Sequence, residues 1–193
     1  VNTTTASYQY APTITALTNG GFVVTWLDCS GADGDPGWGI RARMFDATGT
    51  ALGNDFHVNS TTENSQLYPT ITALTNGGFV ITWADTSGAD GDANYGIRAR
   101  MFDATGTAIG TDFHVNTTTE SGQNFPTITA LTNGGFVVTW MDLSGADGDA
   151  IYGIRARMFD ATGTALGNDF HVNSTTANLQ IYPTITGLNN GGF

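Results

Sequence analysis

The sequence is dominated by a repeat with a period of 57 residues. Residues 69–114 return as residues 126–171 with six differences, and the same text also begins at Pro12 and again at Pro183. A fixed period decides the architecture before chain length does, because each unit has to pack against its neighbours. We divide the chain into repeats at 1–57, 58–114, 115–171 and 172–193, the last of them partial. We expect the chain to be a segment of a longer array.

Within one period the pattern predicts strands and no helix. Residues 70–74 alternate in polarity, and 75–78 (Thr-Asn-Gly-Gly) supply the positive φ angles of a tight hairpin. Residues 79–83 then continue as a second strand with apolar side chains on both faces, which indicates a strand covered from two sides. Residues 97–102 and 112–116 predict a third strand and a short fourth one.

Four short antiparallel strands repeated in tandem are typical of β-propeller blades, so we predict an all-β chain of propeller-like blades. The alternatives are a β-solenoid and a stack that forms a filament. The hairpin pattern favours blades because it places strand pairing within a repeat. Propellers typically need about 4–8 blades to close. We therefore expect further blades or further copies of the chain as partners.

The charge balance excludes some partners. Seventeen acidic residues oppose six arginines, and the net charge of −11 disfavours nucleic acids and anionic membranes. The apolar runs are too short to cross a bilayer, so we expect no membrane insertion. The single Cys29 excludes a disulfide framework. Abundant Thr, Asn, Gly and Asp suggest a secreted protein, extracellular or at a cell surface.

An acidic loop after the second strand is the main candidate site. In the first repeat it reads Asp28-Cys-Ser-Gly-Ala-Asp33-Gly-Asp35. Three carboxylates among glycines provide the oxygen ligands that Ca²⁺ prefers. The alternative is a solvated loop whose aspartates form Asx turns. The predicted metal ligands are Asp28, Asp33, Asp35, Asp85, Asp90, Asp92, Asp142, Asp147 and Asp149.

Aromatic residues at the end of each acidic loop are candidate ligand-binding residues: Trp38, Tyr95 and Tyr152. Such rings can stack on sugars, and the alternative is packing between blades. The positions that differ between the repeats cluster at this edge. For Trp26 and its equivalents, which end the second strand, packing in the core is favoured.

The repeated arginines and histidines have a structural interpretation. Arg41, Arg43 and their equivalents are expected to pair with Asp46 or with the acidic loop rather than to bind a ligand. His57 and its equivalents are expected to be structural. A catalytic centre needs a one-off constellation of groups, whereas each of these polar groups recurs in every repeat. We therefore predict no enzymatic activity.

An Asp-Gly loop and three strings carry a resemblance to a known family: Gly-Gly-Phe-Val-Val-Thr-Trp at 20–26, Gly-Ile-Arg-Ala-Arg-Met-Phe-Asp at 39–46 and Asp-Phe-His-Val-Asn at 55–59. They resemble the tandem repeats of large secreted bacterial adhesins of the repeats-in-toxin type. The resemblance covers the whole chain and implies an exported, calcium-associated, non-enzymatic surface protein with propeller-like repeats. The calcium-binding nonapeptide of that family is missing, so calcium depends on the acidic loop alone.

From these patterns we predict a non-enzymatic extracellular structural or adhesive repeat protein, stabilised by calcium. The alternative is a lectin-like module that binds glycans with the aromatic residues at the loop edge.

Overall fold

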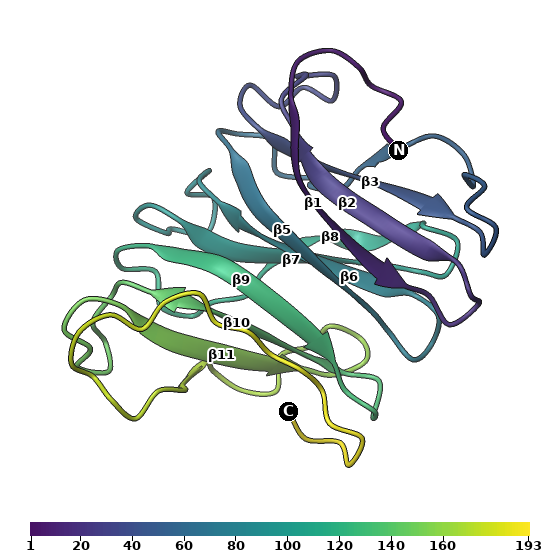
Figure 1. Cartoon of the computed structure of the whole chain (residues 1–193). Coiled ribbons are helices and arrows are strands. Elements are labelled where there is room, and N and C mark those ends of the chain that lie inside the picture. The colour runs from purple at the N-terminus through teal and green to yellow at the C-terminus, as the bar shows by residue number, and fades with distance from the viewer.

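The computed structural model describes residues 1–193 and contains three four-stranded antiparallel sheets and no helix (Figure 1). The first sheet holds β1 (Gln9–Ala16), β2 (Phe22–Asp28), β3 (Gly39–Phe45) and β4 (Phe56–His57). The second holds β5 (Gln66–Ala73), β6 (Phe79–Asp85), β7 (Gly96–Phe102) and β8 (Ala108–His114). The third holds β9 (Gln123–Ala130), β10 (Phe136–Asp142), β11 (Gly153–Phe159) and β12 (Phe170–His171). No helix long and apolar enough to cross a membrane is found.

Each sheet pairs its strands in chain order and within one repeat, so the sheets are blades and a solenoid is excluded. The prediction of four-stranded, propeller-like blades is confirmed. The first strand of each blade is the innermost, because β5 lies between β1 and β9 (Figure 1). Threonine hydroxyls join these inner strands, from Thr13 to the Pro69 carbonyl and from Thr70 to the Pro126 carbonyl, each at 3.4 Å.

The partial fourth repeat continues this arrangement beside the third blade (Figure 1). The amide of Gly187 donates to the Thr129 hydroxyl at 2.9 Å, as the amide of Ala130 does to the Thr72 hydroxyl at 3.2 Å. The same inter-blade contact is thus made twice around the axis.

The cores lie between the blades. One face of β6 packs Phe79, Ile81 and Trp83 toward the first blade, and the other face packs Val80 and Ala84 toward the third. All five are completely buried. Burying a side chain of the larger kind stabilises a fold by about 1.5–3 kcal/mol, so the stacked blades support one another. The prediction that the second strand is covered on both faces is confirmed.

The first strand begins earlier than the sequence pattern suggested, at Gln66 rather than at Thr70. A β-bulge between Leu67 and Thr70 hides the alternation that reveals a strand, because one extra residue shifts the side chains between faces. Tyr68 lies in this bulge with a φ of +54°. The bulge brings that residue to the propeller axis.

Candidate functional site

The loop between the second and third strands and the segment that enters the next blade lie at the same end of the propeller. The amide of Thr86 after β6 donates to the Ser65 carbonyl before β5 at 3.0 Å. The amide of Gln123 at the start of β9 donates to the Tyr95 carbonyl before β7 at 2.8 Å. We call this end the loop end. It carries every site residue that the sequence predicted.

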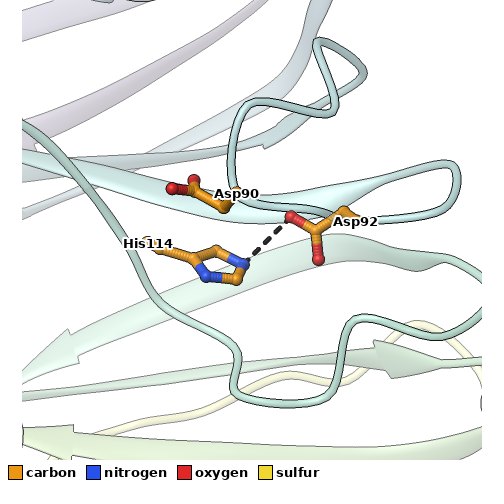
Figure 2. A group of neighbouring side chains, drawn as sticks. All are labelled: Asp90, Asp92 and His114. Atoms are coloured by element: carbon orange, nitrogen blue, oxygen red, sulfur yellow. Dashed lines mark ion pairs between the residues drawn. The ribbon is translucent and has the colours of Figure 1, made fainter.

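Asp90 and Asp92, from the loop between β6 and β7, approach His114 at the end of β8 (Figure 2). Nε2 of His114 lies 3.0 Å from Oδ2 of Asp92. The other Asp92 oxygen accepts a hydrogen bond of 2.8 Å from Asn116 Nδ2. Asp90 forms an ion pair with Arg98. The ligating atoms of Asp90, Asp92 and His114 lie within 4.8 Å of one another, so these three residues could hold a cation.

Asp85, the first predicted metal ligand of this loop, does not join the group. Its buried carboxylate accepts hydrogen bonds from Gln66 Nε2 at 2.9 Å and from Ser87 Oγ at 2.5 Å. Asp28 and Asp142 bond glutamine and serine in the same way. The third blade brings together Asp147, Asp149 and His171, and in the first blade Asp33 pairs with Arg41 and Asp35 with His57.

Calcium at these loops remains a prediction. Ca²⁺ takes about six to eight oxygen ligands, whereas an imidazole nitrogen in the group suits zinc-like ions better. A cation that binds Asp90 would also have to compete with Arg98 for the carboxylate. In the structure, the Asp92 carboxylate contacts His114 and Asn116, which link it into a network of protein side chains.

The arginines divide into two sets. Arg98 lies between two carboxylates, Asp90 and Asp112, the second at 2.8 Å from Nη2. Arg100 pairs with no carboxylate and donates to the Gly110 carbonyl at 3.1 Å. Pairing with the acidic loop therefore holds for Arg98 and its equivalents, and no arginine pairs with the aspartate that follows the third strand.

Tyr95, one of the predicted ligand-binding residues, lines a groove between the first and second blades. The groove has a volume of about 570 Å³, and its walls include Asn64, Ser65 and Asn94. It therefore combines amide and hydroxyl groups with one aromatic ring.

The other predicted aromatic residues lie outside this groove. Trp38 is 37% exposed and stacks on Tyr10, with ring centroids 5.3 Å apart. Tyr152 is half-buried beside the partial repeat, where it forms an isolated bridge with Leu179. Trp83 and Trp140 are buried in the cores between blades, and Trp26 is buried within the first blade beside Val24 and Phe45.

The sequence analysis missed an aromatic cluster at the propeller axis, formed by Tyr68, Phe125 and Tyr182, which we call the axial cluster. The ring centroids of Tyr68 and Phe125 are 4.4 Å apart, and those of Phe125 and Tyr182 are 5.1 Å apart. The three residues line an axial pocket of about 340 Å³ with the prolines that follow them. Ala11 stands at the equivalent position of the first blade. The available signal was an aromatic residue before proline in three of the four repeats.

The backbone of the axial cluster is strained. The φ angles are +54° at Tyr68, +51° at Phe125 and +54° at Tyr182, in the left-handed region that residues with a side chain rarely adopt. Such conformations cost roughly 1–3 kcal/mol each, and they gather at binding and catalytic sites. The rings are therefore held at the axis against a local backbone preference.

Two carboxylates at the loop end are free. Every aspartate of the chain accepts a hydrogen bond or forms an ion pair through its side chain. The side chains of Glu63 and Glu120 are exposed and make no such contact. Each glutamate lies five residues before a ring of the axial cluster, and alanine replaces it in the first and fourth repeats.

No protein-family model matches the sequence, and no curated protein matches it either. Solved structures do match the fold. An endo-arabinase from Bacteroides thetaiotaomicron superposes with a TM-score of 0.53 at 16% identity, over 86% of this chain and 62% of the enzyme. An α-L-arabinofuranosidase from Lactobacillus brevis superposes with a TM-score of 0.52 at 12% identity, over 85% of this chain and 54% of the enzyme. A thermostable family-43 glycoside hydrolase superposes with a TM-score of 0.55 at 11% identity, over 86% of this chain and 55% of the enzyme.

The fold is that of a β-propeller. At these identities the likeness establishes the fold alone. The chain spans between 52% and 62% of the length of the first four enzymes it matches.

These findings correct the sequence-based expectations. The resemblance to repeats-in-toxin-type adhesins is wrong, because four solved structures that share the fold are carbohydrate-active enzymes and no family model supports the adhesin repeats. The prediction of a non-enzymatic adhesive or structural protein, with a lectin-like module as its alternative, is wrong on the same finding. The axial cluster and the two glutamates occur where the repeats differ.

Proposed function

We propose that the chain is part of a carbohydrate-active β-propeller enzyme that cleaves glycosidic bonds in a glycan held at the axial cluster. The observation that carries this proposal is the group of Tyr68, Phe125 and Tyr182, held in left-handed backbone around the axial pocket. Aromatic rings combine a large apolar face with low conformational freedom, which suits the apolar faces of sugar rings. The likeness of the fold to glycoside-acting enzymes supports this choice of ligand.

Glu63 and Glu120 are the proposed catalytic residues. Glycoside hydrolysis typically uses two carboxyl groups, one that protonates the leaving oxygen and one that activates water or attacks the sugar. A carboxylate already bound to other protein groups has to give up those contacts before it can take either role. The two glutamates are the carboxylates without such partners, and both lie at the loop end, just upstream of the axial cluster.

The charge of the chain narrows the substrate class. With a net charge of −11, the protein repels polyanionic glycans. A neutral polysaccharide fits better, and arabinan is the first substrate to test because an endo-arabinase shares the fold. Polysaccharides of this kind lie outside cells, so an extracellular location is part of the proposal. Further blades or copies of the chain that complete the ring are also part of it.

The test measures release of reducing sugar from linear arabinan and other neutral polysaccharides, and release of nitrophenol from 4-nitrophenyl α-L-arabinofuranoside. General acid–base catalysis contributes about 10²–10⁴-fold, so Glu63→Gln and Glu120→Gln should each lower kcat by that order. Asp103→Asn, in an exposed turn, is the matched control and should retain activity. The proposal fails if no substrate is cleaved, or if the doubly substituted protein cleaves as fast as the parent.

A further inference from the structure

Three exposed aromatic residues of the first blade stack on one another at the loop end. The ring centroids of Tyr8 and Tyr10 are 5.7 Å apart and those of Tyr10 and Trp38 are 5.3 Å apart, with interplanar angles of 24° and 15°. Aromatic carbons in contact lie about 3.5–4.0 Å apart, so the near-parallel rings are displaced sideways like steps. Each ring consequently keeps a strip of its surface in solvent. We call this set the aromatic staircase.

The staircase is a departure from the repeat. At the positions of Tyr8 and Tyr10, the second blade has Ser65 and Leu67. No other blade has an aromatic residue at either position. The first blade therefore differs from its neighbours at the loop end in a concerted way.

The first blade has also lost its axial ring. It reads Tyr10-Ala11 where the second blade reads Leu67-Tyr68, so the aromatic residue has moved one position along the chain. Ala11 lines the axial pocket with a φ of +45°, close to that of Tyr68. The axial cluster consequently has three rings and a gap at Ala11, which is next to Tyr10 in the sequence.

The staircase lies over the junction of the first and second blades. Tyr10 pairs across strands with Leu27, so the two side chains share a face of the sheet. Leu27 belongs to the core between the first and second blades. The polar groove between these blades begins beside the staircase, because the amide of Trp38 donates to Ser65 Oγ, in the groove wall, at 3.4 Å.

We infer that the aromatic staircase is a second glycan-binding site, which continues the axial site and takes the distal part of a linear neutral polysaccharide. The polysaccharide passes from the axial cluster over Ala11 to Tyr10 and stacks on the staircase. Its hydroxyl groups point toward the amides of the adjoining groove. This inference rests on the proposed function and adds that the substrate is a long polymer rather than a short oligosaccharide. The acidic surface excludes polyanions as the occupant.

The repeat itself supplies the variants. Tyr8→Ser with Tyr10→Leu installs the residues of the second blade and removes two steps of the staircase. Ala11→Tyr installs the axial ring of the second blade and closes the gap. The sister blade accommodates all three side chains in the same fold, and thermal melts confirm that each variant is folded.

Binding is measured by retardation of the protein in native gels that contain linear arabinan or another neutral polysaccharide, and by calorimetry with arabinotriose. Stacked aromatic contacts are worth about 0.5–1.5 kcal/mol each, so losing two should weaken polymer binding about 5–150-fold. Ala11→Tyr should weaken polymer binding to a similar extent. The Tyr8→Ser, Tyr10→Leu variant should not change trisaccharide affinity by more than about twofold, since a trisaccharide occupies the axial site alone.

The inference is overturned if the variants bind polymer as tightly as the parent does, or if no neutral polysaccharide retards the parent. Parallel loss of polymer and trisaccharide binding in the Tyr8→Ser, Tyr10→Leu variant also overturns it, because the staircase would then not be a separate site. A failure of the proposed hydrolysis can be distinguished from a failure of this inference. If retardation depends on the staircase but no polymer is cleaved, the second site stands and the hydrolase proposal falls.

Discussion

Tyr68 and Phe125 lie with their ring centroids 4.4 Å apart at the propeller axis, although 57 residues separate them in the sequence. Both residues have positive φ angles and both precede a proline. Glycine would adopt this backbone without a steric cost, so the aromatic side chains are present despite the local conformation rather than because of it. Strained residues of this kind gather at binding and catalytic sites, which supports the axial cluster as the proposed glycan site.

The first prediction separates backbone strain from ring contacts at Phe125. Phe125→Gly and Phe125→Ala both remove the ring, but only glycine relieves the left-handed conformation. We expect the glycine variant to be the more stable of the two by about 1 kcal/mol, measured by urea unfolding. At Thr127, which has no positive φ, the order should reverse, with alanine the more stable. Equal stability of the two Phe125 variants would contradict the role given to strain.

The second prediction concerns the ion pair of Arg98 with Asp112, whose side chains are 9% and 2% exposed. Removing one partner leaves an uncompensated buried charge, so Arg98→Met should lower the free energy of unfolding by about 3–5 kcal/mol. Arg100→Met should cost less, since Arg100 donates only to main-chain carbonyls. In denaturant titrations, Arg98→Met combined with Asp112→Leu should recover part of the loss. A loss at Arg98 no larger than at Arg100 would refute this account.

The third prediction is the pH dependence of stability. Burial by itself would raise the pKa of Asp112, but the charge of Arg98 and the amide donors of Ser60 and Thr61 outweigh it and hold the pKa below its ordinary value. A group whose pKa is lowered in the folded state contributes stability that is present above its unfolded pKa, about 3.9 for aspartate. That stability is lost as the pH falls through the folded pKa.

We therefore expect the urea midpoint to be constant between about pH 5 and 7 and to fall below about pH 4. The equivalent residues Asp55 and Asp169 also have lowered pKa values, as do Asp46, Asp103 and Asp160 in exposed turns, so six groups add to the effect. Arg98→Met should flatten the acid limb, because the charge that lowers the Asp112 pKa is gone. A midpoint that stays level down to pH 3 would contradict the assignment.

The sequence predicted the blades because strand period and turn chemistry are local properties. The hairpin at Asn76-Gly77-Gly78 and the two apolar faces of β6 are read directly from side-chain alternation. The order of strands within a blade followed from the hairpins. The strand that faces the axis could not be predicted from the hairpins, because its position depends on how whole blades pack against one another.

The site was harder to predict for two physical reasons. A strand pattern carries no sign of a bulge that turns Tyr68 toward the axis, since the deciding variable is one φ angle. Spacing in the chain also grouped Asp85 with Asp90 and Asp92, whereas the end of β6 directs Asp85 to Gln66 on the neighbouring strand. His114, which completes the group with Asp90 and Asp92, lies 22 residues beyond Asp92 in the sequence, at the end of β8.

The last prediction tests the calcium expectation at the group of Asp90, Asp92 and His114. A cation there has to displace Arg98 from Asp90, so the gain in stability should be modest. We expect millimolar calcium to raise the melting temperature by a few degrees over the value in excess chelator, with recovery on re-addition. Zinc should be compared directly, because the imidazole nitrogen favours it.

The controls for this melt decide between a specific site and screening of the acidic surface. Asp92→Asn keeps the side chain's shape but removes a ligand charge, and it should reduce the calcium effect. Asp103→Asn removes the same charge from an exposed turn that contains no histidine, so it should leave the effect unchanged. If both variants respond to calcium like the parent, the ion acts by screening a chain with a net charge of −11 rather than by coordination. An identical melt in calcium and in chelator would instead leave these aspartates as structural partners of Arg98, His114 and Asn116 alone.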